Sequence, residues 1–181
     1  MPIVSDAGPI MSFARSCLLE LLRSVVRELI IPTAVHGELW THGRTKVGAV
    51  AISEKEWVKE QRVLNRSLVE ILPRKLHLGE REAIVLAQEL GSALLVDDRE
   101  ARKEARLGIA HFGSLRILKE AKERSFIGAV KPALDNLVRS GTVCRRQVVS
   151  GILEAGRGIG QLTSVWEKPQ GVCERTRRFV D

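Results

Sequence analysis

Apolar residues along the chain fall into two alternating patterns. Short runs that are apolar almost throughout predict strands, and the run 93–96 (ALLV) is typical of a strand buried on both faces of a sheet. Longer segments in which apolar residues recur every three or four positions predict helices. The predicted strands lie at 2–5, 29–31, 57–63, 93–96 and 109–112, with 57–63 at an edge.

The first helical segment has the strongest pattern. Its apolar residues follow the i, i+3, i+4, i+7 series from Ile10 to Val25, which predicts one amphipathic helix. Cys17 falls on the apolar face of this helix, so we expect it in the core. Thr33 is expected to cap the next helix. Helices are predicted at 34–39, 78–91, 99–107, 114–121, 128–140 and 145–155, whereas 43–56 is polar and irregular.

The alternation of strands with helices predicts the fold class. Right-handed βαβ units produce a parallel sheet that is covered by helices on both faces. We therefore expect an α/β fold, a three-layer α/β/α sandwich with a central parallel sheet, in one domain over residues 1–155. Residues 156–181 are rich in Gly, Arg and Lys and lack periodicity, which predicts a basic, flexible tail.

Composition narrows the classes of partner. The chain has 29 Lys and Arg against 22 Asp and Glu, a net charge of +7 that favours RNA or DNA, although a basic protein without such a partner has the same balance. No apolar run approaches ~18 residues and the first residues lack a signal-peptide pattern, so we expect a cytoplasmic protein without membrane contact. The 3 cysteines are too widely spaced for a metal site, which predicts reduced thiols.

Acidic residues follow two of the predicted strands directly. Asp6 comes after the first strand, and Asp97 and Asp98 come after the most apolar strand in the chain. Parallel α/β sheets bind ligands beyond the carboxyl ends of their strands. The three side chains are therefore expected at the same edge of the sheet.

Two further carboxylates lie on predicted helices. At about 100° per residue, Glu80 falls at the centre of the apolar stripe of its helix, while Glu82 and Glu89 fall on the opposite side. Glu38 is flanked by apolar residues in a similar but weaker way. A carboxylate that faces a core is costly unless something compensates its charge.

Each of these acids also has a simpler explanation when taken alone. Helix capping accounts for Asp6, Asp97 and Asp98, the helix dipole accounts for Glu80, and a solvent-facing position accounts for Glu38. A metal site explains all of them with one cause. Hard carboxylate oxygens suit Mg²⁺ or Mn²⁺, and such ions support phosphodiester hydrolysis.

The motifs of this chain together resemble those of the PIN-domain family. The segments that carry the resemblance are SDAGPIMSFARSCLLELL, IIPTAVHGEL, GEREAIVLAQELGSALLVDDREAR and HFGSLRILKEAKE, in this order. The resemblance covers about residues 1–155. It is strongest to small prokaryotic PIN-like proteins with a GExEAI third motif, which are related to the VapC-type toxins of toxin–antitoxin pairs.

The resemblance implies a metal-dependent endoribonuclease that cuts RNA and is held in check by a small antitoxin protein, with a homodimer as an open assembly state. It implies that the Mg²⁺ or Mn²⁺ ligands and catalytic residues are Asp6, Glu38, Glu80 and Asp98, with Asp97 as a further ligand. Ser114 corresponds to the polar residue that supports the site. Beside these acids, the basic residues Arg99, Arg102 and Lys103 are expected to attract the phosphate backbone.

Three alternatives remain at this stage. Ala7 stands where many relatives have Ser or Thr, which leaves open a non-catalytic nucleic-acid-binding module on the same scaffold. A housekeeping RNA-processing nuclease would carry the same acids without an antitoxin. A phosphoacceptor receiver domain is disfavoured, because the acidic pair 97–98 is late and no lysine follows the strand 109–112.

Overall fold

A parallel sheet lies at the centre of the protein. The structure is a computed structural model that describes residues 2–43, 56–105 and 108–139. Its 5 strands run in the order β3-β2-β1-β4-β5, and every neighbouring pair is parallel. The strands are β1 (Ile3–Ser5), β2 (Leu29–Pro32), β3 (Val58–Gln61), β4 (Ala93–Leu95) and β5 (His111–Phe112).

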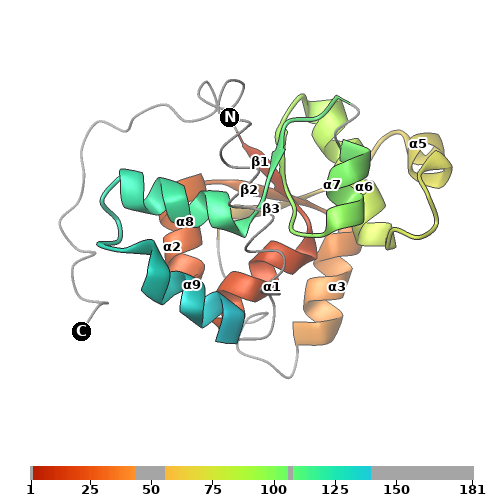
Figure 1. Ribbon diagram of the computed structural model, residues 1–181. Coiled ribbons are helices and arrows are strands. Elements are labelled where there is room, and N and C mark those ends of the chain that lie inside the picture. Colours follow the sequence, from red (N-terminus) through yellow and green to blue (C-terminus); the bar gives the residue numbers. More distant parts are fainter. Residues whose placement is uncertain (1, 44–55, 106–107, 140–181) are drawn as a thin grey trace.

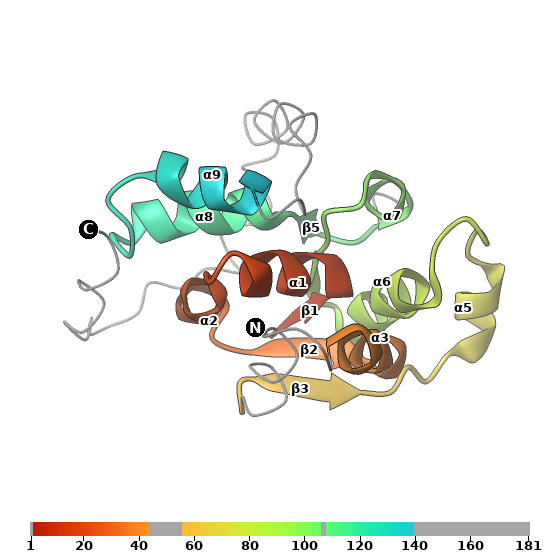
Figure 2. The ribbon, with the colours of Figure 1, turned by 90° about the horizontal axis from the view of Figure 1, so that it is seen from below.

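Helices cover both faces of this sheet, as Figures 1 and 2 show. They are α1 (Ala7–Arg15), α2 (Leu19–Val26), α3 (Thr33–Gly43), α5 (Arg66–Ile71), α6 (Leu78–Leu90), α7 (Arg99–Ala105), α8 (Ser114–Glu123) and α9 (Val130–Arg139). Helices α1, α2, α8 and α9 pack on one face, and α5, α6 and α7 pack on the other. The three-layer α/β/α fold and the edge position of β3 are therefore confirmed.

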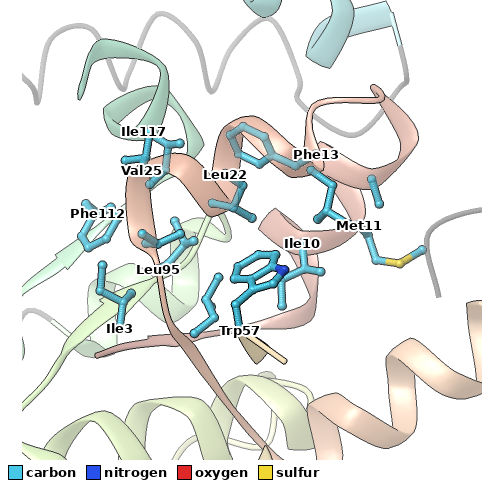
Figure 3. Close-up of a cluster of buried hydrophobic side chains, with 14 of the residues drawn as sticks. Ile3, Ile10, Met11, Phe13, Leu22, Val25, Trp57, Leu95, Phe112 and Ile117 are labelled. Carbon is cyan, nitrogen blue, oxygen red and sulfur yellow. The ribbon is translucent and has the colours of Figure 1, made fainter. Parts of the chain in front are cut away.

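Successive strand residues supply two separate cores. Ile3 and Leu95 point into the core beneath α1, α2 and α8, whereas Val4 and Leu94 point into the core beneath α6 and α7. This division follows from the pleat of a strand, which sends neighbouring side chains to opposite faces. Figure 3 shows the first core, where Leu22 of α2 lies among side chains from α1, α8 and the strands.

The prediction of one continuous helix over 10–25 was wrong, because this segment forms two helices, α1 and α2. Helix α1 ends before Cys17, whose φ of 56° lies in the left-handed region. The N–H of Leu18 donates to the Phe13 carbonyl at 2.8 Å, the bond that typically closes a helix end of this kind. Cys17 is consequently exposed rather than in the core. Both helices bury their apolar faces in the same core, so the periodicity continues across the break.

One helix of the structure was not predicted, and some predicted segments lie outside the residues that the structure describes. Helix α5 was not predicted, because its six residues are too few to establish a periodicity. The predicted helix at 145–155 and the tail at 156–181 lie outside the described residues, as do residues 44–55 of the irregular stretch. Within the described ranges, no helix has the length and apolar composition needed to cross a membrane.

We predict that Leu22→Ala destabilises the protein by about 3 kcal/mol, because it removes a fully buried side chain from the first core. Urea unfolding followed by circular dichroism measures the change. Leu64→Ala is the matched control, since the Leu64 side chain is 83% exposed and its truncation should change stability by less than about 0.5 kcal/mol. Equal midpoints for both variants would contradict the placement of α2.

Candidate active site

The candidate site lies where the two central strands end. Strands β1 and β4 are neighbours, but the chain continues from β1 to β2 on one side and from β4 to β5 on the other. The N–H of Asp6 donates to the Leu95 carbonyl at 3.1 Å, which places the end of β1 directly beside the end of β4. Open α/β sheets bind their ligands at such a switch point.

Asp6 is the buried acid of the site. It caps α1, its Oδ2 accepts from the Gly8 N–H at 3.3 Å, and only 6% of the residue is exposed. The pKa of Asp6 is raised from 3.8 to about 7, chiefly because burial disfavours the charged form and also because the negative charges of Glu80 and Glu38 lie nearby, while the backbone N–H groups of Ala7 and Gly8 act in the opposite direction. Asp6 is therefore a carboxyl group whose ionised form is costly.

Glu38 reaches from α3 to the beginning of α6. Its Oε1 accepts from the Gly79 N–H at 3.2 Å. A Cβ atom on Gly79 would lie 2.6 Å from that same oxygen, too close for any side chain to fit without moving the carboxylate. The glycine is needed here for this close approach, and the positive end of the α6 dipole favours the Glu38 charge.

Glu80 lies in the first turn of α6, half-buried. Its Oε2 accepts from the His77 N–H at 2.8 Å, which helps to cap the helix. Burial raises the pKa of Glu80, the His77 N–H lowers it, and the charges of Asp98 and Glu38 raise it again. Glu80 is thus electrostatically coupled to acids from two other elements.

The two aspartates after β4 have different surroundings. Asp98 accepts from the N–H groups of Glu100 and Ala101 at 2.8 and 2.9 Å through one oxygen, Oδ1, and so caps α7. Asp97 instead accepts from the backbone N–H and the hydroxyl of Ser114 and pairs with Arg102. Ser114 therefore contacts an acid of the predicted set, although that acid is Asp97.

The four acids Asp6, Glu38, Glu80 and Asp98 share one electrostatic neighbourhood. In the part of the chain that the structure describes, however, no three His, Cys, Asp or Glu side chains converge closely enough to hold a metal ion as they stand. All four acids accept hydrogen bonds from nearby backbone N–H groups. Their role as metal ligands stays a prediction.

The chemistry of these donors fits a divalent cation. Every member is a carboxylate, the ligand type that Mg²⁺ and Mn²⁺ prefer. Burial and like charge disfavour ionised Asp6 in the absence of a cation, and a bound cation would reverse that preference. The four side chains therefore supply the ligand type that a divalent cation needs. To coordinate one ion together, the carboxylates that now accept from helix N–H groups would have to rotate.

The helix-phase argument was wrong about Glu82. It placed Glu82 opposite the apolar stripe, yet only 2% of this residue is exposed. Its Oε2 accepts from the Ala34 N–H at 2.9 Å, and its other oxygen pairs with Arg66. Helix α6 packs against α3, α5, α7 and the sheet, so its buried surface is wider than one stripe.

The basic residues predicted to contact nucleic acid differ in their exposure. Arg99 and Lys103 are exposed on α7. Arg102 is not available in the same way, because its Nε donates to the Val96 carbonyl at 2.9 Å and its guanidinium pairs with Asp97. Nothing in the sequence of α7 distinguished Arg102, which faces inward, from the exposed Arg99 and Lys103.

Comparison with known proteins agrees with the fold. A family model described as DUF3368: PIN domain matches residues 2–157. A solved structure, a PilT N-terminus domain protein from the hyperthermophilic archaeon Sulfolobus solfataricus P2, is similar with a TM-score of 0.52 and 20% sequence identity, and the match covers 67% of this chain and 93% of that one. A search of curated proteins found no match.

We predict that the free energy of unfolding decreases as pH rises from about 4 to 7 in the presence of EDTA, relative to Asp6→Asn. Asp6 is protonated in the folded protein over this range but ionised in the unfolded chain, so the unfolded state binds fewer protons. The full difference is on the order of 4 kcal/mol. Urea titrations at several pH values measure it, and parallel curves for wild type and variant would contradict the burial of Asp6.

We predict that Gly79→Ala weakens Mn²⁺ binding roughly tenfold, because the added methyl group displaces the Glu38 carboxylate. Gly37→Ala on α3 is the control, since a Cβ there would meet no described atom within 4 Å. Calorimetric titration measures the affinity, and thermal unfolding in EDTA confirms that both variants fold. Equal affinities would show that Glu38 is not needed at this position.

Proposed function

Because the chain belongs to the PIN-domain family, whose members are generally nucleases that use divalent metal ions, we propose that it is a Mg²⁺- or Mn²⁺-dependent endoribonuclease. The observation that carries the proposal is Asp6, a buried carboxyl group at the end of β1 that experiences the charges of Glu80 and Glu38. A cluster of like charges of this kind, with one member deeply buried, is expected where a cation binds and chemistry takes place.

In this proposal Asp6, Glu38, Glu80 and Asp98 hold the ion through carboxylate oxygens. When bound, the ion supplies a water of lowered pKa and stabilises negative charge on the phosphate. Asp6 must lose its proton to bind the ion, so protons compete with metal below about pH 7. Binding also requires Glu38, Glu80 and Asp98 to give up some of their bonds to backbone N–H groups.

The positive charge of the chain supports RNA as the substrate class. The net charge of +7 attracts a polyanion, and Arg99 and Lys103 are exposed on α7, the helix that Asp98 caps. They would attract the phosphate backbone toward an acidic site that repels it. The bound cation would offset the remaining repulsion. This division between positive surroundings and a negative centre suits a nuclease better than a binding module.

We expect the purified protein to cleave single-stranded or structured RNA with Mn²⁺ and not with EDTA. Asp6→Asn should lower the cleavage rate by about 100-fold or more, since it removes a ligand charge worth several kcal/mol to the transition state. Asp135→Asn is the matched control, because Asp135 lies on α9 in an ion pair with Lys131. RNA that is bound and shifted on a gel but never cut would favour the non-catalytic module.

We further propose that the protein is the toxin of a toxin–antitoxin pair, from its resemblance to VapC-type toxins. A small antitoxin would place an extended or helical segment near the acids. That segment would set a positively charged group on the carboxylates or displace the metal. Expression alone should then slow growth, and Asp6→Asn should relieve this effect. A wild-type protein that cuts RNA in vitro but is harmless when expressed alone would instead favour a housekeeping nuclease.

A further inference from the structure

Asp97 is enclosed by contacts that leave neither of its oxygens without a partner. Its Oδ1 accepts from the Ser114 N–H at 2.8 Å and from Arg102 Nη2 at 3.4 Å, and its Oδ2 accepts from the Ser114 hydroxyl. Ser114 is 1% exposed and begins α8 directly after β5. Asp97 therefore joins the end of β4 to the beginning of α8.

Arg102 closes this arrangement from the other side. Its Nε donates to the Val96 carbonyl, the last residue before the aspartates, at 2.9 Å. Its guanidinium lies against Gly113, where a Cβ atom would be 1.9 Å from Nη2 and 2.7 Å from Asp97 Oδ1. The φ of Gly113 is −117°, which any residue adopts, so the glycine is needed only for this close packing.

Asp98 has the opposite character. Both of its hydrogen bonds go to one oxygen, and within the described residues its Oδ2 accepts none. No described basic side chain lies within ion-pair distance of Asp98, whereas the charge of Asp97 is neutralised by Arg102. The Asp98 charge instead acts on Glu80 across the site. Of the two neighbours, Asp98 alone retains an oxygen and a charge for a ligand.

We propose that Asp97, Arg102 and Ser114, packed on Gly113, form a clamp that fixes the end of β4 and so positions Asp98, which binds the metal while Asp97 does not. This inference rests on the proposed function for the metal, and it removes Asp97 from the predicted ligands. It also changes Arg102 from a contact for nucleic acid into a positioning residue. Asp97 has a positively charged partner and a hydroxyl that orients it. Such partners are typical of residues that position metal ligands without contacting the metal themselves.

A first experiment tests the clamp without metal. Amide hydrogen exchange at Glu100 and Ala101, the two donors to Asp98, is measured by NMR in EDTA. Gly113→Ala and Arg102→Met should each accelerate exchange there several-fold, because the end of β4 loses its anchor. Gly128→Ala, where a Cβ meets no described atom within 4 Å, and Arg23→Met, an exposed residue of α2, are the controls. Unchanged exchange in both clamp variants would overturn the proposal.

A second experiment separates ligand from positioning residue by Mn²⁺ calorimetry. Asp97→Asn keeps an oxygen that accepts from the Ser114 N–H, so it should bind Mn²⁺ nearly as well as wild type, while Asp97→Ala should bind about tenfold more weakly. Asp98→Asn should bind as weakly as Asp98→Ala, because its charge is lost in both. If Asp97→Asn loses as much affinity as Asp98→Asn, Asp97 is a ligand and the proposal fails.

Arg102→Met adds a test of sign. If Asp97 held the ion, removing the adjacent positive charge would tighten Mn²⁺ binding, whereas loss of the clamp weakens it. The Asp97→Ala/Arg102→Met double variant should be no weaker than either single variant, since both remove the same clamp. A wild-type protein that binds no Mn²⁺ would defeat the proposed function, and the exchange experiment would then decide the clamp alone.

Discussion

The site depends on one physical constraint: carboxylates of like charge must lie near one another at the end of a sheet. Backbone N–H groups at the beginnings of three helices meet this constraint, since Asp6 binds the first turn of α1, Glu38 that of α6 and Asp98 that of α7. Each helix supplies partial positive charge and a fixed direction. The parallel sheet makes the arrangement available, because every strand delivers its chain to a new helix at the same edge.

The sequence predicted those parts of the fold that depend on local pattern. Strand β4 was evident from an apolar run without interruption, and Asp6, Asp97 and Asp98 were placed at strand ends because the acids follow such runs directly. The parallel order then brings the ends of β1 and β4 together without further information. The break at Cys17 was missed because it lacks a glycine, the usual signal of a left-handed helix end.

Side-chain roles set by tertiary contacts were beyond the reach of the sequence. Periodicity treats a helix as a cylinder with one buried face, so it could not show that α6 is enclosed and that Glu82 bonds to the start of α3. Nor could spacing distinguish Asp97 from Asp98. Their difference arises from β5 and α8, which bring Ser114 and Gly113 to Asp97 alone, while α7 turns back to provide Arg102.

The central position of β1 has a consequence for biosynthesis. The ribosome makes Asp6 first and Asp98 last among the four acids, and β1 acquires its second neighbour only when β4 has left the exit tunnel. Until then β1 has no strand partner on the side that β4 will occupy, and the set of four carboxylates is incomplete. A nuclease that needs all four acids, as proposed for this chain, can therefore become active only after Asp98 has been made.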